Sequence, residues 1–321
     1  MFSGLHLNKI SFGFFFMSND QKGILLIILG MMLFGVQDLT IKSMVNTGSL
    51  LQIITLRGLI GSIILAVFLK STGRSFSVRS HYPLLAITRG ILFPFGFLCF
   101  YLALAKMPIA EASALFFVSP IFMTILSRII FKNKIGIYRI SAIIFGFVGV
   151  LLIIKPQFEN FDLVMLLPLL CAFTYSVSMI ITKVTKDKDT TFQQTGHIYL
   201  GSIIIGILIY TIFGDYYDNI EGSPSLSYLL RPWIFIEFNI FYKLIIISVF
   251  GTSGILCLIQ AYRIGLPSVI SPFEYTLLIN SLVIGYFVFN ETPDFYSMLG
   301  IALIIASGIY IFIRERSHKN K

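Results

Sequence analysis

Residues 101–155 decide the fold, and they read YLALAKMPIAEASALFFVSPIFMTILSRIIFKNKIGIYRISAIIFGFVGVLLIIK. A helix ends near Ala105, Pro108 marks the turn, and the apolar helix that follows carries Pro120 near its centre. A short basic loop then leads into a glycine-rich apolar helix. The stretch therefore predicts two apolar helical hairpins in sequence, and the rest of the chain can be read outward from them.

The same plan returns near the C-terminus, where residues 261–315 read AYRIGLPSVISPFEYTLLINSLVIGYFVFNETPDFYSMLGIALIIASGIYIFIRE. Pro267 marks the turn, Pro272 lies early in the apolar helix, and a glycine-bearing helix closes the segment. At an offset of 158 residues six identities recur, Ala103/Ala261, Ser113/Ser271, Phe131/Phe289, Tyr138/Tyr296, Ile143/Ile301 and Ile153/Ile311. The shared order of hydropathy features, more than the identities, indicates an internal duplication.

Composition places the chain in a membrane. It is 56% hydrophobic and 12% charged, with a mean hydropathy of +0.89, whereas soluble domains carry about 25% charged residues. The net charge of +9 resides in loops between apolar runs, so it reflects membrane topology and not a nucleic-acid surface. Three cysteines lie far apart in apolar runs, which argues against a disulfide, a metal site or another cofactor.

Ten apolar stretches are long enough to span a bilayer. We predict spans at 23–45, 51–71, 83–105, 109–131, 135–154, 162–182, 196–214, 242–262, 267–289 and 295–313. The connection 215–241 is polar and aromatic and is expected to lie at the interface, with Trp233 as an anchor. Residues 1–22 are predicted to form a cytoplasmic tail, with Met17 as the natural start, and residues 314–321 a basic cytoplasmic tail.

Lys and Arg set the orientation. With the N-terminus inside, the inner segments hold 17 of these residues and the outer segments 5, which predicts that both termini are cytoplasmic. Ten spans in two repeats give five each, and an odd number inverts the second repeat. The predicted fold class is an all-α polytopic membrane protein of ten transmembrane helices, built as two inverted five-helix repeats at 23–155 and 162–313. Such folds are typical of transporters whose substrate site lies between the halves.

The chain resembles the EamA type of the drug/metabolite transporter superfamily. The resemblance covers about residues 20–316 and is carried by ITLRG at 54–58, RGILFPFGFLCFYLALAKMPIAEASALFFVSPIF at 89–122, GFVGVLLIIKP at 146–156, SPFEYTLLINSLVIGYFVFNETPD at 271–294 and LGIALIIASGIYI at 299–311. It implies secondary transport of a small metabolite across a bacterial cytoplasmic (inner) membrane. Members that resemble this chain move amino-acid metabolites, S-adenosylmethionine, riboflavin or opine-type metallophores. One departure is Lys132-Asn133, which stands where the second repeat has Asn290-Glu291.

Ionisable groups inside spans are functional candidates because each costs several kcal/mol (about 3) to insert. By helical rise, Asp38 and Arg57 lie about 10 Å below the outer surface, and Arg89 and Glu274 about 10 Å above the inner one. We predict two ion pairs, Asp38–Arg57 and Arg89–Glu274. They are either static links between helices or groups that bind substrate and open during transport.

Further candidates for substrate binding or gating are neighbours of these charges and aromatic residues, namely Gln37, Tyr101, Tyr175 and Tyr275. Pro120 and Pro272 are predicted helix breaks, since they free carbonyls that need a partner or a water-lined cavity. The four candidate charges sum to zero, which favours a neutral or zwitterionic metabolite. The expected partners are a small-molecule substrate and the lipid bilayer, with no nucleic acid. Proton coupling and a homodimer are left open.

The sequence fits two other classes of membrane protein less well. A channel or a structural membrane protein is the alternative, but a channel favours a ring of like charges and these charges are mixed. An intramembrane enzyme is least favoured, because the sequence holds no HExxH or GxSxG motif and its histidines are scattered.

Overall fold

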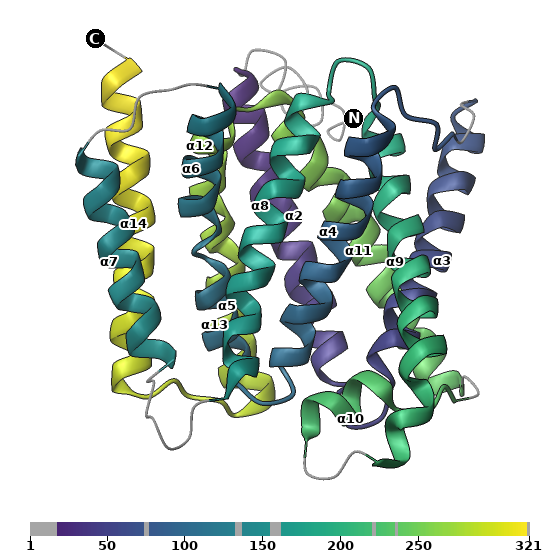
Figure 1. The fold of residues 1–321 in the computed structure, drawn as a ribbon. Helices are drawn as coiled ribbons and strands as arrows, with labels where there is room; N and C mark the ends of the chain where they lie inside the picture. Colours follow the sequence, from purple (N-terminus) through teal and green to yellow (C-terminus); the bar gives the residue numbers. More distant parts are fainter. Residues whose placement is uncertain are drawn as a thin grey trace, which may run out of the picture.

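The computed structural model describes residues 18–73, 77–131, 137–154, 162–219, 223–234 and 237–319. Every regular element in those ranges is helical, which agrees with the predicted all-α class. Figure 1 shows long helices running roughly parallel to one axis. The helices are α2 (Asn19–Lys42), α3 (Leu50–Ser71), α4 (Pro83–Ala103), α5 (Ile109–Phe116), α6 (Ser119–Phe131), α7 (Ile137–Ile154), η1 (Leu163–Leu166), α8 (Leu167–Val184), α9 (Thr191–Phe213), η2 (Gly214–Asn219), α10 (Pro224–Leu230), α11 (Phe238–Ile264), α12 (Pro267–Ile270), η3 (Ser271–Glu274), α13 (Tyr275–Phe289) and α14 (Phe295–Lys319).

Seven helical stretches within the described ranges are long and apolar enough to cross a membrane, and α13 and parts of α7 and α14 form shorter apolar stretches. Large apolar side chains on their outer faces are exposed, such as Ile63, Ile87 and Ile204. In water this surface would be a liability, but in lipid it is the expected exterior. The chain is therefore a multi-pass all-α membrane protein.

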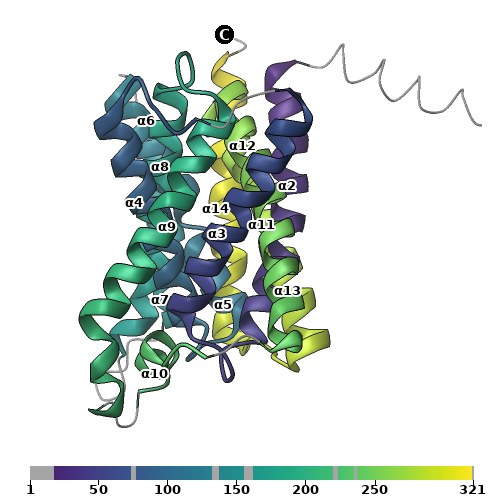
Figure 2. The same cartoon turned by 90° about the vertical axis from the view of Figure 1, so that its right-hand side faces the viewer.

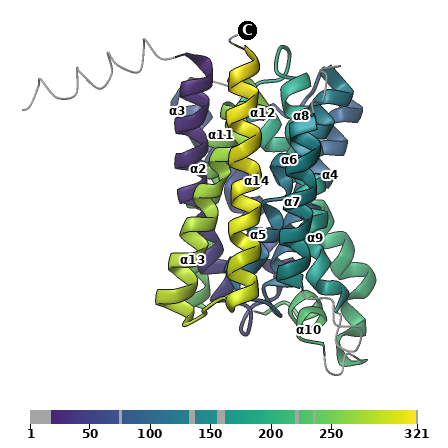
Figure 3. The same cartoon turned by 90° about the vertical axis from the view of Figure 1, so that its left-hand side faces the viewer.

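The order of the helices across the bundle does not follow the chain. α2 packs on α11, α4 on α8, α3 on α9 and α7 on α14. In Figure 1 the α7–α14 pair lies at one edge and the α3–α9 pair at the other. Figures 2 and 3 show α2 beginning and α14 ending at the same end of the bundle, with α10 at the opposite end.

Glycines allow the closest helix contacts. A Cβ at Gly149 on α7 would lie 2.7 Å from the carbonyl oxygen of Gly300 on α14. A Cβ at Gly201 on α9 would overlap the carbonyl oxygen of Gly90 on α4. In lipid, where burying apolar surface does not drive helices together, such backbone contact is a main source of packing energy.

The connection between α9 and α11 covers the bundle end near α10. Trp233 stacks on Tyr210, with ring centroids 4.6 Å apart, and Arg231 donates to the carbonyls of Val45 and Gly48. The side chain of Gln52 donates to the Ile234 carbonyl at 2.8 Å. The segment is thus tied to the α2–α3 turn, beyond the interfacial anchoring that the sequence predicts for Trp233.

Both predicted helix breaks fall where the helices change course. α5 ends at Phe116 and α6 begins at Ser119, so the break immediately precedes Pro120. The segment around Pro272 is the 3-10 turn η3, between the short α12 and α13. These two irregular stretches lie near each other, since α12 and η3 both pack against α6.

Candidate functional site

Asp38 is buried on α2 and forms one polar centre. The Tyr101 hydroxyl, on α4, donates to Asp38 Oδ1 at 2.9 Å, and the Gln37 amide nitrogen donates to the same atom at 3.2 Å. That amide nitrogen also lies 2.6 Å from the Tyr101 hydroxyl. The structure thus brings three of the sequence candidates together in one hydrogen-bonded group that joins α2 to α4.

Arg57 lies buried on α3, but it does not form the predicted ion pair. No salt bridge within the described ranges joins it to Asp38. Its side chain lines a narrow cavity with Phe93, Phe97 and Tyr199, between α3, α4 and α9. The Asp38 carboxylate is hydrogen-bonded by Tyr101 and Gln37 instead of Arg57. The sequence could not predict these partners, because helical rise gives the depth of a residue and not the helix that faces it.

Glu274 forms a second polar centre at the end of η3. It is fully buried and accepts hydrogen bonds from the hydroxyls of Tyr175 (2.5 Å), Tyr262, and Ser119 (3.3 Å). These donors come from α8, α11 and α6. The sequence singled out Tyr175, but it missed Ser119, whose only signal is its place beside Pro120 in the interrupted helix.

Arg89 does not form the second predicted ion pair, the one with Glu274. In the described part of the chain its bonds go to the Thr185 hydroxyl at 3.1 Å and to His197 Nδ1 at 2.6 Å, and it forms no salt bridge with Glu274. Arg can only donate, so His197 Nδ1 accepts and His197 Nε2 donates to the Val78 carbonyl at 2.7 Å. The ends of α8 and α9 supply these acceptors, and equal depth alone could not identify them.

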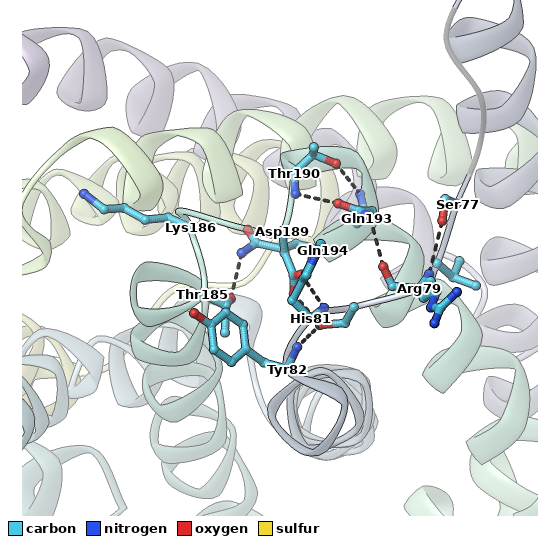
Figure 4. Close-up of polar contacts among 12 residues, drawn as sticks. Ser77, Arg79, His81, Tyr82, Thr185, Lys186, Asp189, Thr190, Gln193 and Gln194 are labelled. Atoms are coloured by element: carbon cyan, nitrogen blue, oxygen red, sulfur yellow. Dashed lines mark hydrogen bonds and ion pairs between the residues drawn. The ribbon is translucent and has the colours of Figure 1, made fainter.

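Arg89 lies beneath a polar group that we call the loop cluster, defined by Ser80, His81, Thr185, Asp189 and Arg263. Figure 4 shows much of it, with the 77–82 segment held against the 185–190 turn. Asp189 accepts from the Ser80 hydroxyl at 2.6 Å and from the His81 amide at 3.1 Å. Arg263 donates to the carbonyls of Asp189 and Lys186, which adds the end of α11. The cluster closes the bundle end at which α2 begins.

An aromatic layer connects the two buried carboxylates. Phe97 contacts Tyr101 with centroids 6.1 Å apart and Tyr175 with centroids 6.3 Å apart. Phe116 packs on Tyr175 at 5.1 Å. Tyr275 lies to one side, since it packs on Phe117 and its hydroxyl donates to the Ile304 carbonyl on α14. Tyr101 and Tyr175 therefore each carry one edge of the layer and one carboxylate.

The opposite end of the bundle carries a separate set of charge contacts. Lys42 on α2 pairs with Glu291 at 2.5 Å, and Glu291 also accepts from the Ile109 amide at 3.1 Å. The Lys106 ammonium hydrogen-bonds the Asp162 carboxylate and so holds the pKa of that carboxyl below its ordinary value. These contacts link turns to helix ends and lie outside the aromatic layer.

The fold and the site describe a membrane protein with a buried polar and aromatic centre. The model of the EamA-like transporter family matches residues 21–155 and 162–313. The chain belongs to that family, and it is a transporter and not an enzyme.

Two relatives are each 26% identical to this chain. An S-adenosylmethionine uptake transporter of Rickettsia bellii (strain RML369-C) is 26% identical over 263 residues, which cover 81% of this chain and 82% of that protein. A riboflavin transporter of Rhizobium johnstonii is 26% identical over 260 residues, covering 79% and 78%. One crystal structure of a protein matches with a TM-score of 0.66 at 16% identity over 92% of this chain and 98% of that one, which shows a common fold.

Proposed function

We propose that the chain is a secondary transporter that carries a small neutral or zwitterionic organic metabolite across the bacterial inner membrane by alternating access. In this proposal residues 23–155 and 162–313 are two inverted five-helix repeats. The tails 1–22 and 314–321 and both termini are cytoplasmic. The two matches of the family model, one in each half, support the division.

The pattern of helix contacts supports an inverted repeat. Exchanging the halves maps α2 onto α8, α3 onto α9, α4 onto α11, the α5–α6 pair onto α12–α13, and α7 onto α14. Under this exchange the α2–α11 contact becomes α8–α4, the α4–α9 contact becomes α11–α3, and the α6–α8 contact becomes α13–α2. The α3–α9 and α7–α14 contacts map onto themselves. Symmetry of this kind lets the two halves rock about a shared centre.

The observation that carries the proposal is the buried centre itself. Asp38, Arg57 and Glu274 are each more than nine-tenths buried, and an aromatic layer lies between the two carboxylates. Ionisable groups at such depth are costly in a membrane and mark substrate or ion pathways. The aromatic faces suit a planar organic solute. The relatives named for S-adenosylmethionine and riboflavin, both of which contain planar rings, agree with this class of substrate.

The loop cluster is the candidate gate at the cytoplasmic end, in place of the Arg89–Glu274 pair that the sequence predicts. It joins the 77–82 segment of one repeat to the α8–α9 turn and α11 of the other. Opening that end requires these contacts to part. Arg89, which lies beneath these contacts, then either loses its hydrogen bonds to Thr185 and His197 or moves together with those two residues.

Proton coupling centres on Glu274 in this proposal. Among the described residues its direct hydrogen-bond partners are hydroxyls and include no cation. Those hydroxyls come from three helices, so a change in charge on Glu274 alters contacts across both repeats. Asp38, by contrast, lies within electrostatic reach of Arg57. A homodimer stays a prediction.

Uptake into proteoliposomes tests the function. Purified protein should accumulate radiolabelled S-adenosylmethionine or riboflavin to a saturable level above empty vesicles, and an imposed pH gradient should change the rate. Glu274→Gln keeps the shape of the side chain and cannot ionise. It should abolish the response to the pH gradient while exchange of labelled for unlabelled substrate persists. An unchanged response in the variant would exclude Glu274 as the coupling group.

A further inference from the structure

The strongest unassigned feature is a pair of polar groups that face one point beside α11. A Cβ placed on Gly251 would lie 3.1 Å from Arg57 Nε and 3.2 Å from Arg57 Nη2, and it would collide with Gln37 Oε1. The guanidinium of α3 and the amide oxygen of α2 therefore meet at the bare backbone of Gly251. Both side chains are more than nine-tenths buried.

Neither group is satisfied within the described part of the protein. Gln37 Oε1 is a buried acceptor without a hydrogen-bond partner, because the amide nitrogen of that side chain makes the contacts to Asp38 and Tyr101. Arg57 has no salt bridge there. A buried acceptor left unpaired costs free energy, and so does a buried cation without a contacting anion. The chemistry that relieves both is an N–H donor for Gln37 beside an anion for Arg57.

We infer that this place binds the α-amino-acid headgroup of the substrate, with the carboxylate on Arg57 and the ammonium on Gln37 Oε1. The headgroup holds its anion and its cation one carbon apart, which matches two groups that converge on one point. Asp38, hydrogen-bonded to Gln37, supplies the countercharge for the ammonium. The inference rests on the proposed function and narrows its substrate to amino-acid-headed metabolites.

The side chains around Arg57 indicate the chemistry of the rest of the substrate. Beside Arg57 the lining of the narrow cavity is mostly apolar and aromatic, with Phe93, Pro94, Phe97 and Tyr199, and this lining favours a substrate with an apolar, aromatic or thioether group next to its headgroup. Glu274 already accepts from three hydroxyls, and Arg89 donates to Thr185 and His197 through its two terminal nitrogens, although its Nε has no partner among the described residues. Arginine can bind a carboxylate through two parallel hydrogen bonds, whereas the ammonium of lysine cannot form this bidentate contact.

A ligand series with purified full-length protein tests the assignment. The probes are S-adenosylmethionine, L-methionine and L-phenylalanine, each compared with the derivative that lacks the carboxylate and with the derivative that lacks the amino group, and riboflavin as a ligand without a headgroup. Affinity is measured by isothermal titration and thermal shift in detergent. Removing either head charge should weaken binding by about 10-fold to 100-fold.

Variants separate contact from structural support. Arg57→Lys should weaken binding of the intact compounds by about 10-fold or more and leave binding of the decarboxylated amines unchanged. Gln37→Met should weaken the intact compounds and leave the deaminated acids, which have no N–H donor at that position, unchanged. Arg231→Lys is the matched control, because that arginine binds the carbonyls of Val45 and Gly48 in the α2–α3 turn and does not belong to the proposed headgroup site. Its affinity for every probe should equal that of the wild type.

The outcomes distinguish this inference from the function on which it rests. The inference is overturned if none of the compounds that carry the amino-acid headgroup binds at millimolar concentration. It is also overturned if the wild type and Arg57→Lys each bind compounds with the headgroup and compounds without it at equal affinity. Riboflavin transport without binding of headed compounds leaves the transporter standing and removes the headgroup site. Binding of headed compounds with no flux in proteoliposomes supports the site and contradicts the transport function.

Discussion

Gly201→Ala should destabilise the protein although alanine favours helices. The added Cβ on α9 overlaps the Gly90 carbonyl oxygen on α4, and both atoms are backbone-fixed, so no side chain can move aside. Overpacking a tight contact costs about 1–3 kcal/mol, occasionally more. Alanine gains up to about 1 kcal/mol over glycine in helices measured in water. Because the overlap is with a backbone atom, the upper end of the overpacking cost applies, and the net loss is about 2 kcal/mol. Thermal unfolding in detergent measures it as a lower melting temperature.

Gly285→Ala is the matched control, since it makes the same change inside α13. Its Cβ would approach Ile109 no closer than 3.4 Å, an ordinary van der Waals contact. This variant should melt at the wild-type temperature or slightly above. Equal melting temperatures for the two variants would refute the close approach of α4 and α9, and a stabilised Gly201→Ala would refute it more strongly.

The remaining predictions concern the gate, the Glu274 centre and the topology. Asp189→Ala removes the acceptor of two donors of the 77–82 segment. A cysteine in place of Ser178, which is fully buried on α8 below the loop cluster, should then react with maleimide about 10-fold faster, and an unchanged rate would exclude the loop cluster as a gate. Tyr262→Phe removes one donor to Glu274 and should cost about 1–3 kcal/mol of unfolding free energy, and a variant as stable as the wild type would contradict the hydroxyl contact. Reporter fusions after position 188 and at the C-terminus should be cytoplasmic, and a fusion near position 222 should be external. A cytoplasmic reporter near position 222 would contradict the inverted-repeat topology.

Hydropathy predicted the positions of the seven membrane-length apolar stretches found in the described residues, because each spanning element has to satisfy its backbone hydrogen bonds within lipid. The predicted span 109–131 matches α5 and α6 together, including the interruption at Pro120. The predicted span 83–105 ends close to the observed end of α4 at Ala103. These features depend only on neighbouring residues in the chain. The length of an apolar run and the position of a proline, which lacks an N–H, can both be read directly from the sequence.

The pairing of side chains could not be predicted in the same way. Depth along a helix says nothing about which face a residue occupies or which helix lies opposite. Arg89 and Glu274 have similar depth, but α8 and α9 lie beside Arg89 and supply Thr185 and His197. Only the order of helices across the bundle reveals that Glu274 is enclosed by hydroxyls. The sequence indicates Tyr101, Tyr175 and Gln37 as candidates because large polar or aromatic side chains in apolar runs are conspicuous, whereas a small serine such as Ser119 is not.

Counterflow tests the central claim of a metabolite carrier most directly. Proteoliposomes loaded with a concentrated bacterial metabolite extract are placed in dilute labelled S-adenosylmethionine, riboflavin and L-methionine, and internal label is followed over time. A carrier that works by alternating access should transiently accumulate at least one labelled compound above its external concentration, with a rate that saturates and that rises with the loaded extract. Equilibration without overshoot, at a rate proportional to concentration and indifferent to loading, would indicate a channel, and no uptake above empty vesicles would contradict transport of these metabolites altogether.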